Sequence, residues 1–329
     1  MKVICFGVRD VEKPIFEKYN QNYNYELELR SESLTPENVD IIKGYDAVIC
    51  RASDKVNREV LTKAKEFGID YVLTRTVGYD HMDLEAIHEL NIKSARVPSY
   101  SPTAISELAV SMALTLSRRS LYFASKAAAE YDYKILPEGF AREMKNSVVG
   151  IIRTGKIGLE SAKMFKGLGA KVLGFDPYPN PNANGIIEYV SLDELLNQSD
   201  IVSLHMPYIK GVNDKMINDE FIAKMKDGAI LVNTARGQLQ DESAILRALK
   251  SGKLYAAALD VFYSEKLYFG KKLTEIEDPV IKKLVNMFPK VMTTPHIGSY
   301  TDEAVANMVE ISYQNLKELS SNIECKNKL

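Results

Sequence analysis

Tryptophan is absent from the chain, and cysteine and histidine are scarce, with three and four residues among 329. The cysteines Cys5, Cys50 and Cys325 are far apart, and the first two lie in apolar segments of the kind that form buried strands. We expect reduced thiols and a cytoplasmic protein, because disulfide frameworks need conserved cysteine pairs in an oxidising compartment. No pair of cysteines or histidines has metal-ligand spacing, so we expect no metal site.

The chain also lacks an excess of one charge, because its 42 lysines and arginines nearly balance its 44 aspartates and glutamates. Proteins that bind nucleic acid usually carry a basic face, so we expect no such partner. Apolar runs fall short of the roughly 18 residues that a membrane span needs. The first of them, in MKVICFGVRD, has the length of a buried strand and is not typical of a signal peptide. We therefore expect a soluble globular protein without a membrane partner.

Short β-rich apolar segments alternate with helical segments along nearly the whole chain. Such alternation is typical of α/β proteins, in which helices cover both faces of a parallel sheet. A chain of 329 residues is also too long for one compact core. The strands that we predict are Val3–Gly7, Ala47–Cys50, Tyr71–Leu73, Val148–Ile152, Val172–Phe175, Ile201–Leu204, Ile230–Val232 and Ala256–Leu259.

Two long helical segments, Thr103–Arg119 and about Asp302–Leu319, indicate where the chain passes between domains. We predict two Rossmann-like, doubly wound parallel-sheet domains. Residues 101–298 would form a nucleotide-binding domain, inserted into a discontinuous substrate domain of residues 1–100 and 299–329. We expect the active site in the cleft between the two domains.

The segment SVVGIIRTGKIG, residues 147–158, combines an apolar strand, a tight turn and the start of a helix. The dinucleotide pattern G-x-G-x-x-G falls on positions 153, 155 and 158, where the chain has Arg153, Gly155 and Gly158. Asp176 ends the next strand, 21 residues after Gly155. A carboxylate at this spacing binds the ribose hydroxyls and repels the 2′-phosphate of NADP, so the sequence predicts NAD.

Arginine in place of the first glycine leaves two interpretations open. Gly155 still lets backbone amides approach the pyrophosphate, and the helix N-terminus still supplies positive potential. Arg153 can crowd the turn and weaken cofactor binding, or its guanidinium can add a charge-assisted contact to a phosphate. The two interpretations predict opposite effects of replacing Arg153 with glycine.

Three segments place chemically versatile side chains directly after apolar strands: ILVNTARGQ with Arg236, AALDVFYSE with Glu265, and VMTTPHIGSYT with His296. Each side chain alone is more typical of a surface, but the carboxyl ends of parallel strands meet at one edge of a sheet. Reduction of a 2-oxo acid needs a cation for the carboxylate and a proton donor. Arg236 suits the first task and His296 the second, because histidine changes charge near neutral pH. Glu265 would stabilise the imidazolium form.

The motifs NTARG (233–237), LDVFYSE (259–265) and TPHIG (294–298) resemble those of the D-2-hydroxyacid dehydrogenases, and the resemblance covers nearly the whole chain. The segments GVRD (7–10), RTVGYD (75–80), VPSYSP (97–102) and GSYTDE (298–303) resemble the branch of D-lactate and (R)-2-hydroxyglutarate dehydrogenases. The resemblance implies an NAD-dependent enzyme with a D (R) product, and a homodimer formed largely through the cofactor domain. It also implies that Arg236, Glu265 and His296 are catalytic.

The resemblance assigns further positions around substrate and cofactor. It implies that the amides of Val77 and Gly78 hold the substrate carboxylate and that Tyr100 and Tyr300 line the pocket. Around NAD it implies contacts at Gly155, Lys156, Ile157, Gly158, Asp176, Met206, Pro207, Asn213, Thr234, Ala235 and Asp260. Arg153 departs from the family pattern, which has glycine there.

Two more cations bear on the identity of the substrate. Arg9 and Arg51 follow predicted strands, and together they would suit a second carboxylate, as in 2-oxoglutarate. They could instead bind the only carboxylate of pyruvate, or pair with neighbours such as Asp10. The candidate substrates are therefore 2-oxoglutarate, pyruvate and branched 2-oxo acids.

A different class of function is compatible with the same fold, namely a non-catalytic NAD-sensing protein. The altered fingerprint favours this alternative, whereas the complete set of three catalytic residues favours an enzyme. His205, which precedes several cofactor-contact positions, is expected to have a structural role near the nicotinamide and not to transfer a proton.

Overall fold

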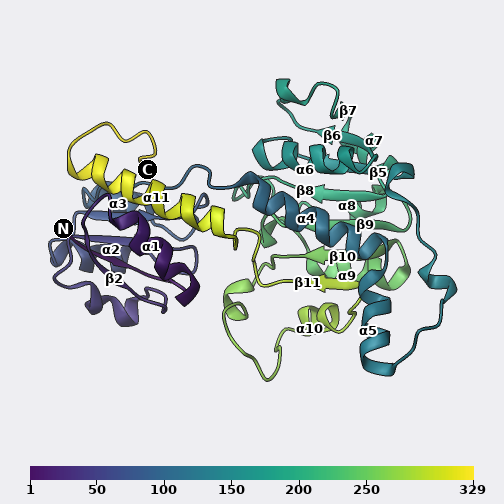
Figure 1. The fold of residues 1–329 in the computed structure, drawn as a ribbon, viewed down its shortest axis with the longest axis horizontal. Helices are drawn as coiled ribbons and strands as arrows, with labels where there is room; N and C mark the ends of the chain where they lie inside the picture. The colour runs from purple at the N-terminus through teal and green to yellow at the C-terminus, as the bar shows by residue number, and fades with distance from the viewer. The chain divides into compact units, whose positions relative to one another are not determined.

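The computed structural model describes the backbone of residues 1–329 and every side chain except that of Lys266. The chain divides into two compact units, which we call unit 1 (Met1–Ser101 with Tyr300–Leu329) and unit 2 (Pro102–Ser299). Each unit contains one sheet whose paired strands are all parallel (Figure 1). No helix in the described chain is long and apolar enough to cross a membrane.

Unit 1 is built on a sheet with the strand order β2-β1-β3-β4. Its strands are β1 (Lys2–Cys5), β2 (Glu26–Leu29), β3 (Ala47–Cys50) and β4 (Tyr71–Thr74). Its α-helices are α1 (Lys13–Asn20), α2 (Arg58–Glu66), α3 (Leu84–Glu89) and α11 (Asp302–Ser320). The chain leaves β1 in one direction along the sheet and returns to β3 on the other side. The loops after β1 and β3 therefore flank the switch point, where doubly wound sheets bind ligands.

Both faces of the unit 1 sheet are buried. In β1, Val3 and Cys5 pack into a core with Tyr313 of α11, whereas Ile4 packs into a second core with Leu61 of α2. Successive side chains of a strand point to opposite faces, so a strand that is apolar at every position needs helices on both sides. The C-terminal helix α11 thereby completes the core of the unit that the N-terminus begins.

Unit 2 has the strand order β11-β10-β9-β8-β5-β6-β7. Its strands are β5 (Val148–Ile152), β6 (Lys171–Phe175), β7 (Glu188–Tyr189), β8 (Ile201–Leu204), β9 (Ala229–Asn233), β10 (Leu254–Leu259) and β11 (Val291–Thr293). Its α-helices are α4 (Pro102–Ser117), α5 (Ser120–Glu130), α6 (Lys156–Gly167), α7 (Leu192–Gln198), α8 (Asp219–Lys224), α9 (Glu242–Ser251) and α10 (Pro279–Val285). The first strand, β5, lies between β6 and β8, which puts the β5–α6 turn at the switch point of this sheet.

The predicted fold class, two doubly wound parallel sheets, is confirmed, whereas some elements differ from our expectation. The helix predicted over 103–119 ends at Ser117, because Arg119 adopts a left-handed conformation with φ +54°. A further helix, α5, follows where no helix was predicted. We missed β2 and β7, since both are short sheet-edge strands with partly exposed side chains. A weak apolar pattern of this kind does not distinguish an edge strand from a loop.

Candidate active site

The three side chains that we expect to be catalytic follow three neighbouring strands of unit 2. Arg236 comes after β9, Glu265 after β10 and His296 after β11, and the sheet order places β10 between the other two. All three strands are parallel, so their carboxyl ends open onto the same edge of the sheet.

His296 and Glu265 form a direct pair. The Nδ1 atom of His296 lies 3.0 Å from Oε1 of Glu265, and both side chains are partly exposed, by 32% and 23%. The second carboxylate oxygen of Glu265, Oε2, is buried and has no hydrogen-bond partner in the described part of the chain. A carboxylate on Nδ1 fixes the orientation of the ring and leaves Nε2 to exchange a proton. This is the geometry of an acid–base histidine with its orienting group.

Asp260, at the end of β10, anchors the loop that carries His296. Its side chain is fully buried, and Oδ1 accepts hydrogen bonds from the Thr294 hydroxyl (2.6 Å) and the Ile297 amide (2.9 Å). Oδ2 accepts a hydrogen bond from the Gly298 amide (3.0 Å). Burial raises the pKa of this carboxyl, against the effect of the three hydrogen bonds. His296 itself has φ +55°, a costly conformation that persists only where surrounding contacts impose it.

Asn233 and Gly237 shape the loop that carries Arg236, and we did not single them out in the sequence. Asn233 is buried at the end of β9, where its side chain donates to the carbonyl of Arg236 (3.0 Å) and accepts from the amide of Ala235 (2.9 Å). A Cβ atom on Gly237 would lie 2.0 Å from the carbonyl carbon of Phe262. Glycine therefore lets the Arg236 loop touch the backbone of the loop that leads to Glu265.

A buried polar network extends this connection between the two loops. Gln240 accepts from the Asn233 side chain (2.7 Å) and donates to the carbonyl of Val261 (3.0 Å). Glu242 accepts from Gln240 (3.3 Å) and from the amide of Tyr263 (2.8 Å), and burial raises the pKa of Glu242. Fully bonded buried networks fix one arrangement of the backbone, so this network positions the segments before and after the catalytic candidates.

The turn between β5 and α6 fits a dinucleotide phosphate. Gly155 is the N-cap residue of α6, and a Cβ atom built on it would meet no other atom within 4 Å. A Cβ atom on Gly158 would lie 2.0 Å from the carbonyl oxygen of Arg153, so only glycine lets the helix pack this closely on the turn. Open space over Gly155, together with the free amides of the first helical turn, is the arrangement that binds pyrophosphate.

Arg153 makes an ion pair that neither of our two interpretations included. Its Nη1 atom lies 3.0 Å from Oδ1 of Asp176, the carboxylate expected at the ribose. Arg153 has φ +71°, which costs roughly 1 kcal/mol for a residue with a side chain. Asp176 also accepts from the amides of Thr154 (2.8 Å) and Tyr178 (3.0 Å). Burial raises the pKa of Asp176, but the hydrogen bonds outweigh it and the net shift is downward.

Two buried polar atoms without partners lie just after the ends of β8 and β9. Among the described residues, the Nδ1 atom of His205 and the hydroxyl oxygen of Thr234 make no hydrogen bond. Burial lowers the pKa of His205 to about 4, so this histidine is neutral at physiological pH. Polar atoms left unpaired in a protein usually have a ligand or water as partner. A polar ligand such as a nicotinamide nucleotide fits these atoms.

The remaining predicted cofactor positions in unit 2 line the loop after β8. Met206 is buried, and Asn213 holds the loop by donating to the carbonyl of Pro207 (2.8 Å) and accepting from the amide of Ile209 (2.7 Å). Asn213 therefore contributes to the shape of this loop whatever else it contacts.

The predicted substrate residues belong to unit 1. The carbonyl of Val77 accepts from Arg96 (3.0 Å), and that of Gly78 accepts from the Thr76 hydroxyl (2.6 Å), which holds this loop after β4 in place. The amides of Val77 and Gly78 have no acceptor in the described structure. The Tyr100 carbonyl accepts from the side chain of Asn307 (2.6 Å). The role of the Val77 and Gly78 amides in binding the substrate carboxylate stays a prediction.

Arg9 belongs to a cluster of arginines around a buried glutamate. Glu12 is only 1% exposed, and its carboxylate lies 3.1 Å from Nη1 of Arg9 and 3.2 Å from Nη2 of Arg75. The guanidinium of Arg9 also stacks on the ring of Tyr300, 4.2 Å from its centre. Arg75, which belongs to the segment RTVGYD, is buried, and this role of its side chain was not predicted from the sequence.

Arg51 is the least well paired member of this cluster. Its Nη1 atom lies 4.0 Å from Glu12 and 3.4 Å from the carbonyl of Gly7, and its side chain is 19% exposed. Burial, followed by the charges of Arg75 and Arg9, lowers the pKa of Arg51 to about 10, against the opposing effect of Glu12. The loop after β3 thus holds a partly exposed cation that an anionic ligand would stabilise.

Known proteins match this chain over its whole length. Residues 110–298 match the family model described as "D-isomer specific 2-hydroxyacid dehydrogenase, NAD binding domain". An aromatic 2-oxoacid reductase of Clostridium sporogenes is 41% identical over 99% of this chain and 98% of its own. The crystal structure of a D-lactate dehydrogenase from Treponema pallidum, 37% identical, aligns with a TM-score of 0.89 over 100% and 99% of the two chains.

An NAD-complexed D-isomer specific 2-hydroxyacid dehydrogenase from Lactobacillus delbrueckii is also similar, with 30% identity and a TM-score of 0.84 over 100% of both chains. These likenesses agree with the open fingerprint turn and with the unpaired polar atoms at the ends of β8 and β9. The chain therefore belongs to the D-2-hydroxyacid dehydrogenases, which are NAD-dependent oxidoreductases.

Proposed function

We propose that the enzyme reduces a 2-oxo acid to the D-2-hydroxy acid with Arg236, Glu265 and His296 as its catalytic residues. The observation that carries this proposal is the 3.0 Å contact between His296 Nδ1 and Glu265 Oε1. The turn at Gly155 and the carboxylate of Asp176 would hold NADH, which would supply the hydride that reduces C2 of the substrate. Arg236 binds the substrate carboxylate and polarises the carbonyl group.

His296 supplies the proton in this scheme. With Nδ1 bonded to Glu265, its Nε2 donates a proton to the carbonyl oxygen as C2 is reduced. Glu265 stabilises the imidazolium before the transfer, and in the oxidation direction neutral His296 accepts the hydroxyl proton. Asp260 and Asn233 hold the loops of His296 and Arg236 in place and do not touch the reacting atoms.

Replacement of His296 tests this role. We expect His296→Ala to lower kcat by roughly 10²- to 10⁴-fold, measured as NADH absorbance with a saturating 2-oxo acid. His88→Ala is the matched control, because His88 is exposed at the end of α3. A His296→Ala enzyme with most of its rate intact would rule out His296 as the proton donor.

For the substrate, we propose a 2-oxo acid with a second carboxylate, of which 2-oxoglutarate is the simplest candidate. The support comes from unit 1, where Arg51 follows β3 at the switch point with only weak contacts to Glu12. A second carboxylate would give this guanidinium the charge-assisted bonds that it lacks. Two relatives are named an aromatic 2-oxoacid reductase and a D-lactate dehydrogenase, so aromatic 2-oxo acids and pyruvate are the competing substrates.

Kinetics with a panel of 2-oxo acids decides between these substrates. We expect the highest kcat/KM with 2-oxoglutarate, a loss of about 10- to 100-fold for it in Arg51→Gln, and little change for pyruvate. Arg51→Lys should recover part of the loss, and Arg30→Gln, at a half-exposed surface ion pair, should have no effect. A 2-oxoglutarate kcat/KM that is no better than that of pyruvate, and unaffected in Arg51→Gln, would refute the dicarboxylate proposal.

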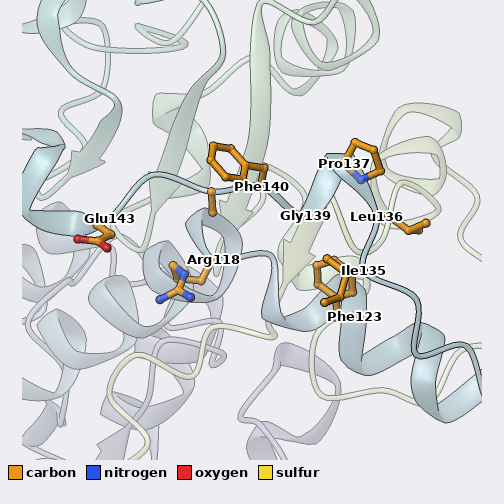
Figure 2. A pocket seen from close by; sticks show the side chains of 9 residues that line it. Arg118, Phe123, Ile135, Leu136, Pro137, Gly139, Phe140 and Glu143 are labelled. Atoms are coloured by element: carbon orange, nitrogen blue, oxygen red, sulfur yellow. The ribbon is translucent and has the colours of Figure 1, made fainter.

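We propose further that the enzyme is a homodimer in the cytoplasm. The segment after α5 exposes large apolar side chains, with Tyr133 81%, Ile135 95% and Phe140 89% exposed. Ile135, Phe140 and Phe123 line a hollow of about 640 Å³ in unit 2. Figure 2 shows Ile135 close to Phe123, with Phe140 farther away. Exposed apolar patches of this kind are typical of protein interfaces, and a second copy is the occupant that we propose. The buried free thiols support a reducing compartment.

Light scattering tests the dimer directly. We expect the mass of two chains for the wild type and of one chain for Ile135→Asp/Phe140→Asp, because two buried carboxylates would oppose the contact. A wild-type monomer, or a variant that stays dimeric, would contradict the proposed interface.

A further inference from the structure

Arg153 places a cation at the position where the dinucleotide fingerprint has an uncharged glycine. It occupies the turn after β5 with φ +71°, and its Nη1 atom lies 3.0 Å from Asp176 Oδ1. Asp176 is the carboxylate expected to bind the adenosine ribose of the cofactor. The ion pair therefore lies where NAD and NADP differ, which is the 2′ position of that ribose.

The ion pair changes what Asp176 offers to a cofactor. Oδ1 accepts from Arg153 and from the Tyr178 amide, and Oδ2 accepts from the Thr154 amide. A carboxylate has about four acceptor sites, so most of them are in use within the turn itself. An unpaired aspartate here repels a 2′-phosphate, but the positive charge of Arg153 cancels that repulsion.

Arg153 also keeps donors for a further anion. Its side chain is 33% exposed, whereas that of Asp176 is 9% exposed. The Nε and Nη2 atoms of Arg153 have no partner within the described structure. Guanidinium N–H groups bind phosphate oxygens in a planar fork, and a nearby arginine is the usual partner of a 2′-phosphate in this type of fold.

We propose that Arg153 lets this enzyme use NADPH as well as NADH, by neutralising Asp176 and binding the 2′-phosphate. The same ion pair competes with the ribose hydroxyls of NADH for Asp176 Oδ1, so Arg153 weakens NADH binding while it permits NADPH binding. The inference rests on the proposed cofactor contacts at Gly155 and Asp176 and does not depend on the catalytic residues.

Calorimetric titration of the whole enzyme with NADH and with NADPH tests the inference without turnover. For the wild type we expect the Kd of NADPH to lie within about tenfold of that of NADH. In Arg153→Gly the ratio of the two Kd values should rise at least tenfold, through weaker NADPH binding and unchanged or tighter NADH binding. Arg153→Asn should give the same result, because asparagine tolerates the left-handed conformation and carries no charge.

Arg142→Gly is the matched control, since Arg142 is an exposed arginine of the same unit whose closest carboxylate lies 3.9 Å away. It should leave both Kd values unchanged. Wild-type NADPH binding that is more than tenfold weaker than NADH binding, or a ratio that rises less than tenfold in both Arg153 variants, overturns the inference. NADH binding in the same titrations shows separately whether the cofactor site is intact, and loss of catalysis in His296→Ala leaves the ratio unaffected.

Discussion

Asp260 offers a sharp test of how the catalytic loop is held. In Asp260→Asn the amide oxygen can take the place of Oδ1 and still accept from Thr294 and Ile297. The amide nitrogen then takes the place of Oδ2, which now accepts from the Gly298 N–H at 3.0 Å. Two donors would meet in a fully buried place, and flipping the amide would set its nitrogen against the Ile297 N–H instead. One buried donor therefore loses its acceptor in either orientation.

The size of the effect follows from these contacts. An unsatisfied buried donor costs about 1–3 kcal/mol, and the two remaining hydrogen bonds lose their charge assistance. The neutral amide is easier to bury than a carboxylate whose pKa burial raises, which offsets part of the cost. We expect a net loss of about 2 kcal/mol, or a Tm lower by roughly 4–8 °C.

The loss of kcat in Asp260→Asn should be larger than the loss of folding stability alone would cause. His296 holds φ +55° within the clamped loop, and a displacement of about 1 Å costs roughly 100-fold in rate. Calorimetry and kcat at 25 °C, where the variant is still folded, measure the two effects separately. Asp227→Asn is the control, because Asp227 is 90% exposed in a surface ion pair with Lys253. If Asp260→Asn matched this control in both Tm and kcat, the anchoring role of Asp260 would be wrong.

Two further perturbations test the packing and the burial of this site. Gly237→Ala would place Cβ 2.0 Å from the Phe262 backbone, so we expect about 1–3 kcal/mol of destabilisation by calorimetry and at least a tenfold loss of kcat/KM. Gly167→Ala has open space around it and should be neutral, and equal behaviour of the two variants would contradict the close approach. Burial lowers the pKa of His205 from its usual 6.5 to about 4, so the unfolded chain takes up the proton first as the pH falls. Stability on the order of 3 kcal/mol should be lost between pH 6.5 and 4, and the Tm of His205→Gln without cofactor should depend less on pH. Parallel Tm curves for His205→Gln and the wild type would rule out this source of acid sensitivity.

Local sequence patterns were sufficient to predict the fold class and the edge of the sheet at which the catalytic candidates lie. Apolar segments of strand length that alternate with helices specify parallel sheets, and parallel sheets bring the carboxyl ends of their strands to one edge. The segments that carry Arg236, Glu265 and His296 each follow such a strand, so their common edge could be predicted before any contact was known. Gly155 and Gly158 likewise marked the turn expected to bind phosphate: Gly158 leaves no room for a side chain against the carbonyl of Arg153, and the space over Gly155 is open.

Side-chain partners were decided only by the tertiary structure. The sequence predicted a carboxylate at Asp176 and an unexpected cation at Arg153, but only the folded turn pairs them. Asp260, expected to contact NAD, gives its oxygens to a loop 34 to 38 residues later in the chain. Glu12 pairs with Arg75, which lies 63 residues later in the chain. Periodicity specifies which face of an element is buried, whereas the choice among many possible polar partners depends on distances and angles that exist only after the strands have paired.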